Sequence, residues 1–203
     1  MPYQIDWSTV SSISDVAQVV DGLWTFDSNG IRPVYMGYDR LVAIGDIAAW
    51  DNYVVEVPIT IHSVESNTVG NDPGVGLGIR WQGHTADGNQ PSVQYYPTGG
   101  FAFYRLHATP EFDLWNGQAP YVVTTSGTPL TLRTTYIFKY QVEAITGENQ
   151  YSFKVWKQGD PEPSAWLLTG QKATSADLSS GSLLLIAHKL DATFGNISVS
   201  PLP

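Results

Sequence analysis

The stretch Asn71–Arg105, NDPGVGLGIRWQGHTADGNQPSVQYYPTGGFAFYR, decides the fold predicted for this chain. Apolar side chains recur at every second position in it, and clusters of Asp, Gly, Asn and Pro separate the alternating runs. Alternation places successive side chains on opposite faces of a β-strand, and residues of these types favour turns. We therefore expect three short strands joined by two turns.

The first of these strands carries polar residues that point to a binding surface. Its apolar positions are expected to face a core, and these are Val75, Leu77, Ile79 and Trp81. The other face is predicted to carry Arg80, Gln82 and His84 in one row, roughly 6–7 Å apart from the rise per residue of a strand. Glycines precede the row, so a flat ligand has room to lie there.

Short alternating or apolar runs continue along the chain. In the clearest, Tyr53–Ile61, the odd-numbered residues are expected to face the core, and Pro58 to mark a sheet edge or a bulge. Further strands are expected at Leu23–Phe26, Val34–Tyr38, Arg40–Ile44, Glu111–Gly117, Pro120–Thr125, Pro129–Arg133, Tyr136–Ile145, Tyr151–Trp156, Leu183–Ala187 and Thr193–Val199. About a dozen such strands predict an all-β fold, an antiparallel β-sandwich (jelly roll) of two curved sheets, with residues 1–203 as a single domain.

The composition argues against several classes of partner. Ten basic and 19 acidic residues give a net charge of −9, which disfavours binding to nucleic acid or to an anionic membrane surface. The chain has no cysteine, so it forms no disulfide and offers no thiolate. No apolar run approaches the ~20 residues that insertion across a membrane requires. Aromatic residues make up 12%, an excess that favours exposed rings at a binding surface.

Polar side chains on the non-core faces of several predicted strands are candidates for ligand binding. If these strands share one curved sheet, the side chains line one concave groove. Planar Arg, Gln and Glu groups pair with sugar hydroxyls, and the apolar face of a pyranose stacks on an aromatic ring. The predicted ligand-binding residues are Glu56, His62, Arg80, Gln82, His84, Tyr96, Tyr104, Lys139, Gln141, Glu143 and Trp156. An ordinary antiparallel sheet with one solvated face explains the same pattern.

The sequence does not decide between binding and catalysis. A retaining glycosidase needs two carboxyl groups about 5–5.5 Å apart. Glu56 and Glu143 are the one plausible pair on sheet strands, and no strand carries a ladder of carboxylates. A polysaccharide lyase needs a group that neutralises the substrate carboxylate and a Tyr or His base. The residues that fit those roles are Arg80, Gln82, His84 and Tyr104.

Calcium is the cofactor that we expect, in a structural role, and no organic cofactor is expected. Asp21, Asp27 and Asp191 lie near predicted strand ends, where carboxylates tie loops together through a cation. Ordinary turn aspartates are the alternative interpretation.

Six short segments, from about Asp21 to the end of the chain, resemble a known family. They are YDRL (38–41), WDNY (50–53), GLGIRW (76–81), YSFKVW (151–156), PEPSAW (161–166) and DATFGNISV (191–199). Together they resemble concanavalin A-like lectin/glucanase (LamG-type) jelly-roll domains of large secreted bacterial proteins. The resemblance implies a concave ligand face and frequent calcium, in a family of carbohydrate-binding modules, glycosidases and polysaccharide lyases.

We therefore predict a carbohydrate-binding module of a secreted or cell-surface bacterial protein, which recognises a polysaccharide or other glycan on the concave sheet face. The first alternative is a polysaccharide lyase or glycoside hydrolase in the same groove. The second is a structural or adhesive module without a sugar site. The glucanases' carboxylate ladder is missing, and Arg80-x-Gln82-x-His84 is a faint version of a lyase motif, so binding is favoured over catalysis.

Overall fold

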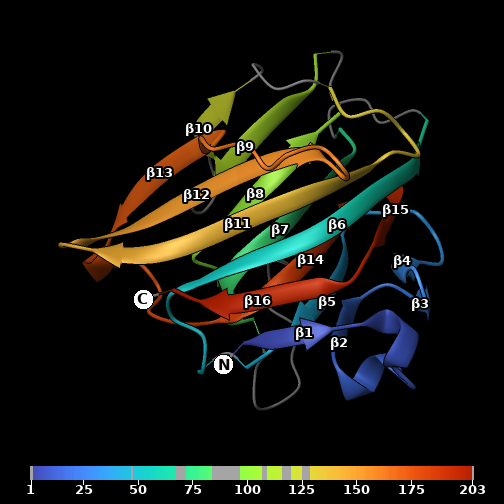
Figure 1. Ribbon diagram of the computed structural model, residues 1–203, viewed down its shortest axis with the longest axis horizontal. Coiled ribbons are helices and arrows are strands. Elements are labelled where there is room, and N and C mark those ends of the chain that lie inside the picture. Colours follow the sequence, from blue (N-terminus) through green and yellow to red (C-terminus); the bar gives the residue numbers. More distant parts are fainter. Residues whose placement is uncertain are drawn as a thin grey trace.

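The computed structural model describes residues 2–46, 48–66, 72–83, 97–106, 109–115, 120–124 and 129–202. In these ranges the chain forms antiparallel β-strands and three short 3-10 helices. None of those helices is long and apolar enough to cross a membrane. The strands form two sheets stacked face to face, with one sheet in front of the other in Figure 1. The predicted all-β sandwich is confirmed.

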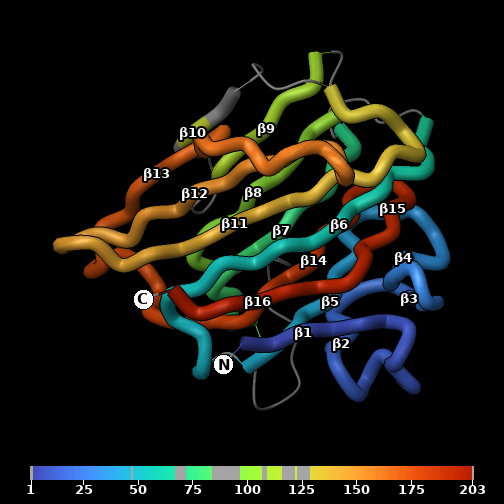
Figure 2. The backbone as a smooth tube through the Cα atoms, viewed as in Figure 1, coloured from blue at the N-terminus to red at the C-terminus, as the bar shows by residue number. Residues whose placement is uncertain are grey.

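The first sheet, called here the nine-stranded sheet, has the order β13-β12-β11-β6-β15-β4-β3, with β16 beside β6 and β1 beside β16. Its strands are β1 (Tyr3–Ile5), β3 (Trp24–Asp27), β4 (Gly30–Pro33), β6 (Tyr53–Val64), β11 (Thr135–Ile145), β12 (Glu148–Lys157), β13 (Leu168–Ala173), β15 (Leu190–Phe194) and β16 (Ile197–Pro201). Figure 2 shows β6 lying between β11 and the β15–β16 segment, which are far from it in sequence.

The second sheet, the seven-stranded sheet, has the order β10-β9-β8-β7-β14-β5-β2. Its strands are β2 (Gln18–Asp21), β5 (Arg40–Ile44), β7 (Gly74–Trp81), β8 (Gly100–Arg105), β9 (Glu111–Trp115), β10 (Pro120–Thr124) and β14 (Ser182–His188). The core lies between the two sheets and takes alternate residues from each. Tyr53, Val55, Val57, Ile59 and Ile61 of β6 all enter it, as their spacing predicts.

Pro58 lies opposite the break between strands β15 and β16. It belongs to a central strand, and its carbonyl accepts a hydrogen bond of 2.7 Å from the Gly195 amide. Gly195 and Asn196 separate β15 from β16, which both pair with β6. The nitrogen and carbonyl of one strand residue point to the same side, so the amide hydrogen that proline lacks falls at this interruption. The expected irregularity is therefore a break in the partner strand.

A bulge at Arg80 overturns the predicted alternation at the end of β7. The register with β14 shifts there, because Gly78 pairs with Leu184 and Trp81 pairs with Ser182. Arg80 takes the left-handed region at φ 53°, which is uncommon for a residue other than glycine. Trp81 consequently leaves the face of Ile79. It packs in a second apolar cluster with Leu41, Ala43, Phe101, Phe103, Leu184 and Ile186, on the opposite face of the seven-stranded sheet.

The Arg80 side chain is buried at the end of the sandwich and links the two sheets. It is 2% exposed. Its guanidinium donates to the carbonyls of Asp51 at 2.9 Å and Leu178 at 2.7 Å, and to Asp177 Oδ2 at 3.3 Å. Its backbone amide donates to the Tyr53 hydroxyl at 2.7 Å. The prediction that Arg80 belongs to an open row on a solvated face is therefore wrong.

Three other strand predictions need correction. Residues 34–38 do not form a strand: Lys189 donates to the Gly37 carbonyl there, and Asp39 has φ 45°. Pro129–Arg133 leads into a turn, where Arg133 has φ 62° and Thr134 donates to the Thr131 carbonyl. Thr193–Val199 is divided between two strands at Gly195 and Asn196.

The first strand of the 71–105 stretch is β7 and its last is β8, whereas the middle one falls outside the described residues.

We predict that Arg80→Ala destabilises the fold by about 3–5 kcal/mol, because it removes a buried guanidinium that hydrogen-bonds to the Asp51 and Leu178 carbonyls and leaves Lys172 as the remaining ion-pair partner of the buried Asp177. The matched control is Arg32→Ala, which breaks the ion pair with Asp191. The Arg32 side chain is 45% exposed, so this change should cost no more than about 1 kcal/mol. Urea unfolding of both variants measures the difference. Equal losses of stability would contradict the structural role of Arg80.

Candidate functional site

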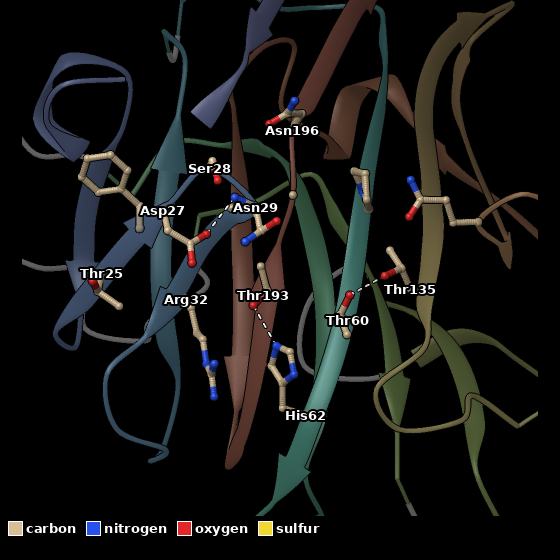
Figure 3. A pocket seen from close by; sticks show the side chains of 15 residues that line it. Thr25, Asp27, Ser28, Asn29, Arg32, Thr60, His62, Thr135, Thr193 and Asn196 are labelled. Carbon is tan, nitrogen blue, oxygen red and sulfur yellow. Dashed lines mark hydrogen bonds between the residues drawn. The ribbon is translucent and has the colours of Figure 1, made fainter. Parts of the chain in front are cut away.

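A polar groove of about 690 Å³ lies on the outer face of the nine-stranded sheet. Its floor comes from β6, β11 and β15, and the β3–β4 hairpin forms one wall (Figure 3). We call it the polar groove. It is lined by Thr25, Phe26, Asp27, Ser28, Asn29, Gly30, Arg32, Pro58, Thr60, His62, Thr135, Gln158, Thr193, Gly195 and Asn196.

A row of threonines crosses the floor of the groove. Thr60 of β6 pairs in register with Thr193 of β15 on one side and with Thr135 of β11 on the other. The three side chains therefore lie on neighbouring strands, roughly 4.8 Å apart from one strand to the next. The Thr60 and Thr135 hydroxyls are hydrogen-bonded at 2.7 Å. Each hydroxyl both donates and accepts, so this row offers mixed hydrogen-bonding capacity to a ligand.

His62 lies at one end of the threonine row because of a bulge in β6. The register shifts there, since Asp191 pairs with Ser63 and Ala192 pairs with Ile61, so that His62 has no partner of its own in β15. Its Nε2 atom is 2.8 Å from the Thr193 hydroxyl, the contact drawn in Figure 3. Burial lowers the pKa of His62, and the nearby Arg32 lowers it further. The imidazole is therefore neutral at pH 7 and has both a donor and an acceptor nitrogen.

The hairpin wall adds amide and carboxylate groups. Asp27 accepts a hydrogen bond of 2.7 Å from the Asn29 amide, which fixes the turn between β3 and β4. Arg32 makes a bidentate ion pair with Asp191, with Nε 2.6 Å from Oδ1. This pair neutralises Arg32, and Asp27 is the one carboxylate among the lining residues. The groove thus combines many uncharged donors and acceptors with little net charge.

A charged row crosses the same face of the sheet beyond Pro58. Lys139 pairs in register with Glu56 on β6 and with Lys154 on β12. The Lys139 ammonium is 2.7 Å from Glu56, and Glu162 of the following loop lies 3.0 Å from Lys139 and 2.7 Å from Lys154. Hydrogen bonds from both lysines lower the pKa of Glu162. Lys154 also lies 4.6 Å from the centre of the Trp166 ring. The loop that carries Glu162 and Trp166 therefore covers part of this face, and its Glu162 forms ion pairs with both lysines.

The structure brings together some of the predicted ligand-binding residues. His62 lines the polar groove. Trp156 pairs with Ile137, which pairs with Pro58 of the groove floor, so Trp156 lies on the groove's border. Glu56 and Lys139 share the same outer face, and Gln141 and Glu143 follow further along β11, away from the groove.

Three other predicted residues, Arg80, Gln82 and Tyr104, lie elsewhere in the structure. Arg80 belongs to β7 of the seven-stranded sheet, and Gln82 directly follows that strand. The Gln82 side chain donates to the Ser180 carbonyl at 2.8 Å. Tyr104 is 1% exposed in the core, because Phe101 and Phe103 take the outward positions of β8. It is therefore wrong to place Tyr104 at a groove. His84 and Tyr96 lie outside the described residues.

The predicted calcium residues do not form one cluster. Asp21 is 2.8 Å from Arg40, Asp191 is paired with Arg32, and Asp27 caps the hairpin turn. In the ranges that the structure describes, no group of three or more His, Asp and Glu side chains is placed to hold a metal ion. Two of the three carboxylates are already neutralised by arginines, so this set does not fit calcium.

Several groove residues were not identified from the sequence. Thr193, Thr135, Arg32 and Asn196 reach the groove through the pairing of distant strands, which local alternation does not reveal. Alternation along its strand places Thr60 on the correct face. The Asn29-Gly30 dipeptide signals the hairpin turn, and this is the local clue that a wall stands beside the sheet.

Comparison with known proteins identifies the fold. Neither a scan against protein families nor a search of curated protein sequences finds a match. The exoplasmic/lumenal domain of VIP36 in its Ca²⁺/Man3GlcNAc-bound form is similar in structure, with a TM-score of 0.59 and 7% identity over 99% of this chain and 91% of that chain. The metal-free carbohydrate recognition domain of Emp46p gives a TM-score of 0.60 and 5% identity, over 96% and 94% of the two chains.

Lectin I-B4 from Griffonia simplicifolia, in its metal-free form, gives a TM-score of 0.59 and 9% identity over 100% of both chains. These similarities span nearly the whole described fold at very low identity. The chain therefore has the concanavalin A-like lectin jelly-roll fold that its sequence resembles.

We predict that His62 makes stability depend on pH. Its pKa in the folded state lies below the ordinary value of 6.5. The unfolded chain therefore binds a proton more readily, and stability should fall as the pH decreases from about 6.5 through the pKa of the folded state. Urea unfolding of the wild type and of His62→Gln between pH 4.5 and 8 tests this. The variant should lose less stability at acid pH, and parallel profiles would contradict the prediction.

Proposed function

We propose that this protein is a glycan-binding module and that the polar groove on the outer face of the nine-stranded sheet holds a neutral sugar. The observation that carries the proposal is the threonine row ending at His62. It supplies hydroxyl and imidazole groups in a depression of about 690 Å³. A sugar ring presents hydroxyls that both donate and accept, and hydroxyl, imidazole and amide groups match that pattern.

The charges of the groove favour a neutral ligand. Arg32 is paired with Asp191, which leaves no cationic cluster among the lining residues for phosphate or sulfate. The net charge of −9 adds a general repulsion toward polyanions. Asp27 and Asn29 on the hairpin wall provide one acceptor-rich edge, which is suited to two adjacent hydroxyl groups.

The fold supports the same proposal from a separate direction. VIP36 and Emp46p are similar in structure, and the first is bound to mannose-containing ligands while the second is a carbohydrate recognition domain. A fold that holds sugars in such proteins is a suitable scaffold for glycan binding here, and the polar groove supplies the polar groups for it. Location in a secreted or cell-surface protein is part of the proposal.

Binding rather than hydrolysis suits the groove. Hydrolysis of a glycosidic bond ordinarily needs two carboxyl groups on either side of it. Asp27 is the one carboxylate in the lining, and it is engaged by the Asn29 amide. The residues considered for a lyase include Arg80 and Tyr104, which are buried in other parts of the structure.

We predict that Thr60→Val weakens sugar binding about 5- to 10-fold. The change removes one hydroxyl and keeps the shape of the side chain, which corresponds to the loss of about one hydrogen bond. The matched control is Thr169→Val, on the exposed edge strand β13 and outside the groove. A neutral glycan array identifies the sugar, and calorimetry then measures both variants against it.

If the array shows no binding of the wild type at millimolar sugar, the structural or adhesive alternative is favoured. If both valine variants bind like the wild type, the site lies elsewhere. Release of reducing ends, or of unsaturated products absorbing at 235 nm, from a polysaccharide panel would contradict a purely binding function.

We further predict that binding in this groove persists in EDTA. The aspartates near the groove are held by Arg32 and by the Asn29 amide, and no described lining residue belongs to a metal-binding group. Affinity for the sugar found on the array should change less than twofold after exhaustive treatment with chelator. A complete loss of binding that calcium restores would show that a cation site supports the ligand.

A further inference from the structure

A second depression, of about 390 Å³, adjoins the polar groove. It shares Thr25 and Arg32 with the groove and continues along the segment that follows β4, with Asp191 at the junction. Its remaining lining is apolar or aromatic and comes from Pro33, Val34, Tyr35 and Met36. The two depressions therefore meet at the Arg32–Asp191 ion pair, with a polar surface on one side and an apolar surface on the other.

Tyr35 is the most exposed large hydrophobic side chain in the described part of the molecule, at 69%. The backbone beneath it is nevertheless held in place. The Val34 amide donates to the Leu23 carbonyl at 2.8 Å, and the Lys189 amide donates to the Gly37 carbonyl at 2.8 Å. Arg40 donates to the Tyr35 carbonyl at 3.3 Å. The segment thus presents an exposed ring from a fixed backbone, and such a ring costs little conformational entropy when it binds.

We propose, on the basis of the function proposed above, that the two depressions form one extended site for a neutral oligosaccharide of at least two units. One sugar unit is bound through its hydroxyls in the polar groove. The next unit crosses the Arg32–Asp191 pair and stacks its apolar face on the Tyr35 ring. An exposed aromatic ring beside a hydroxyl-rich groove matches the two faces of a pyranose, one polar at its edge and the other apolar.

The Arg32–Asp191 ion pair at the junction can contact an oligosaccharide that passes over it. The Arg32 side chain is 45% exposed, and its Nε and Nη2 atoms face Asp191. A guanidinium carries five N–H groups, so it can donate to the glycosidic or ring oxygens of a bound chain while it keeps its carboxylate partner. Arg32 thereby links the two subsites without adding net charge.

The test compares chain lengths in one sugar series. The probes are the mono-, di- and tetrasaccharides of linear manno-, gluco- and galacto-oligosaccharides, measured by calorimetry against the wild type, Tyr35→Ala and Tyr35→Phe. The wild type should bind the longer chains at least tenfold more tightly than the monosaccharide. Tyr35→Ala should remove most of that gain and leave monosaccharide affinity unchanged, whereas Tyr35→Phe should retain it. Tyr38→Ala, which alters an exposed ring outside both depressions, is the matched control.

The outcomes separate the two proposals. If the wild type binds neither these series nor any neutral glycan on the array, the proposed function fails. If it binds monosaccharide but Tyr35→Ala keeps the full gain for longer chains, the extended site is wrong while the polar groove stands. Sedimentation of the same proteins tests whether the apolar segment instead forms a contact between two copies of the protein. A dimer of the wild type that Tyr35→Ala dissociates, with unchanged affinity for sugars, would assign the segment to protein contact and overturn the extended site.

Discussion

The structure depends on a buried arginine that links the two sheets at one end of the sandwich. Arg80 has a left-handed backbone near the end of β7, and its side chain reaches the segments that precede β6 and β14. Asp177, whose side chain is fully buried, accepts hydrogen bonds from Arg80, Asn149 and Tyr151, and its other carboxylate oxygen lies 2.9 Å from the Lys172 ammonium. A charged pair inside a protein is costly unless hydrogen bonds satisfy it. Here the surrounding carbonyl, hydroxyl and amide groups supply those bonds, so the pair fixes how the sheets meet.

This burial decides which surfaces remain for a ligand. Strand β7 looks most like a binding surface in the sequence, but its Arg80 side chain is buried in contacts that hold the fold together. Its neighbour Trp81 packs in the second apolar cluster. The nine-stranded sheet keeps an accessible polar face instead. Three irregularities shape the groove on it: the break opposite Pro58, the bulge at His62 and the turn of the β3–β4 hairpin. The first two interrupt regular pairing, and all three contribute residues to the lining of the depression.

The sequence predicts much of the fold because its strands bury one face. Alternation places Tyr53, Val57 and Ile61 correctly in the core, and the turn signals separate most strands. It fails at Arg80, because a single extra residue reverses the faces that follow, and nothing in local hydrophobicity marks such a bulge. It also fails to place Arg32 beside Asp191, since that contact depends on the pairing of strands 159 residues apart. The candidate site is assembled mainly from such distant pairings, so the sequence identifies His62 but not Thr193.

The central claim is that a glycan occupies the outer face of the nine-stranded sheet rather than the strand that carries Arg80. The most direct measurement is a titration of isotope-labelled protein with the oligosaccharide that binds most tightly in calorimetry. NMR follows the backbone amides, the His62 ring and the threonine methyl groups. We predict that the largest shifts fall on Thr60, His62 and Thr193, while the Arg80 and Gln82 amides stay unchanged. Shifts concentrated on the seven-stranded sheet, with the threonine row unaffected, would contradict the account.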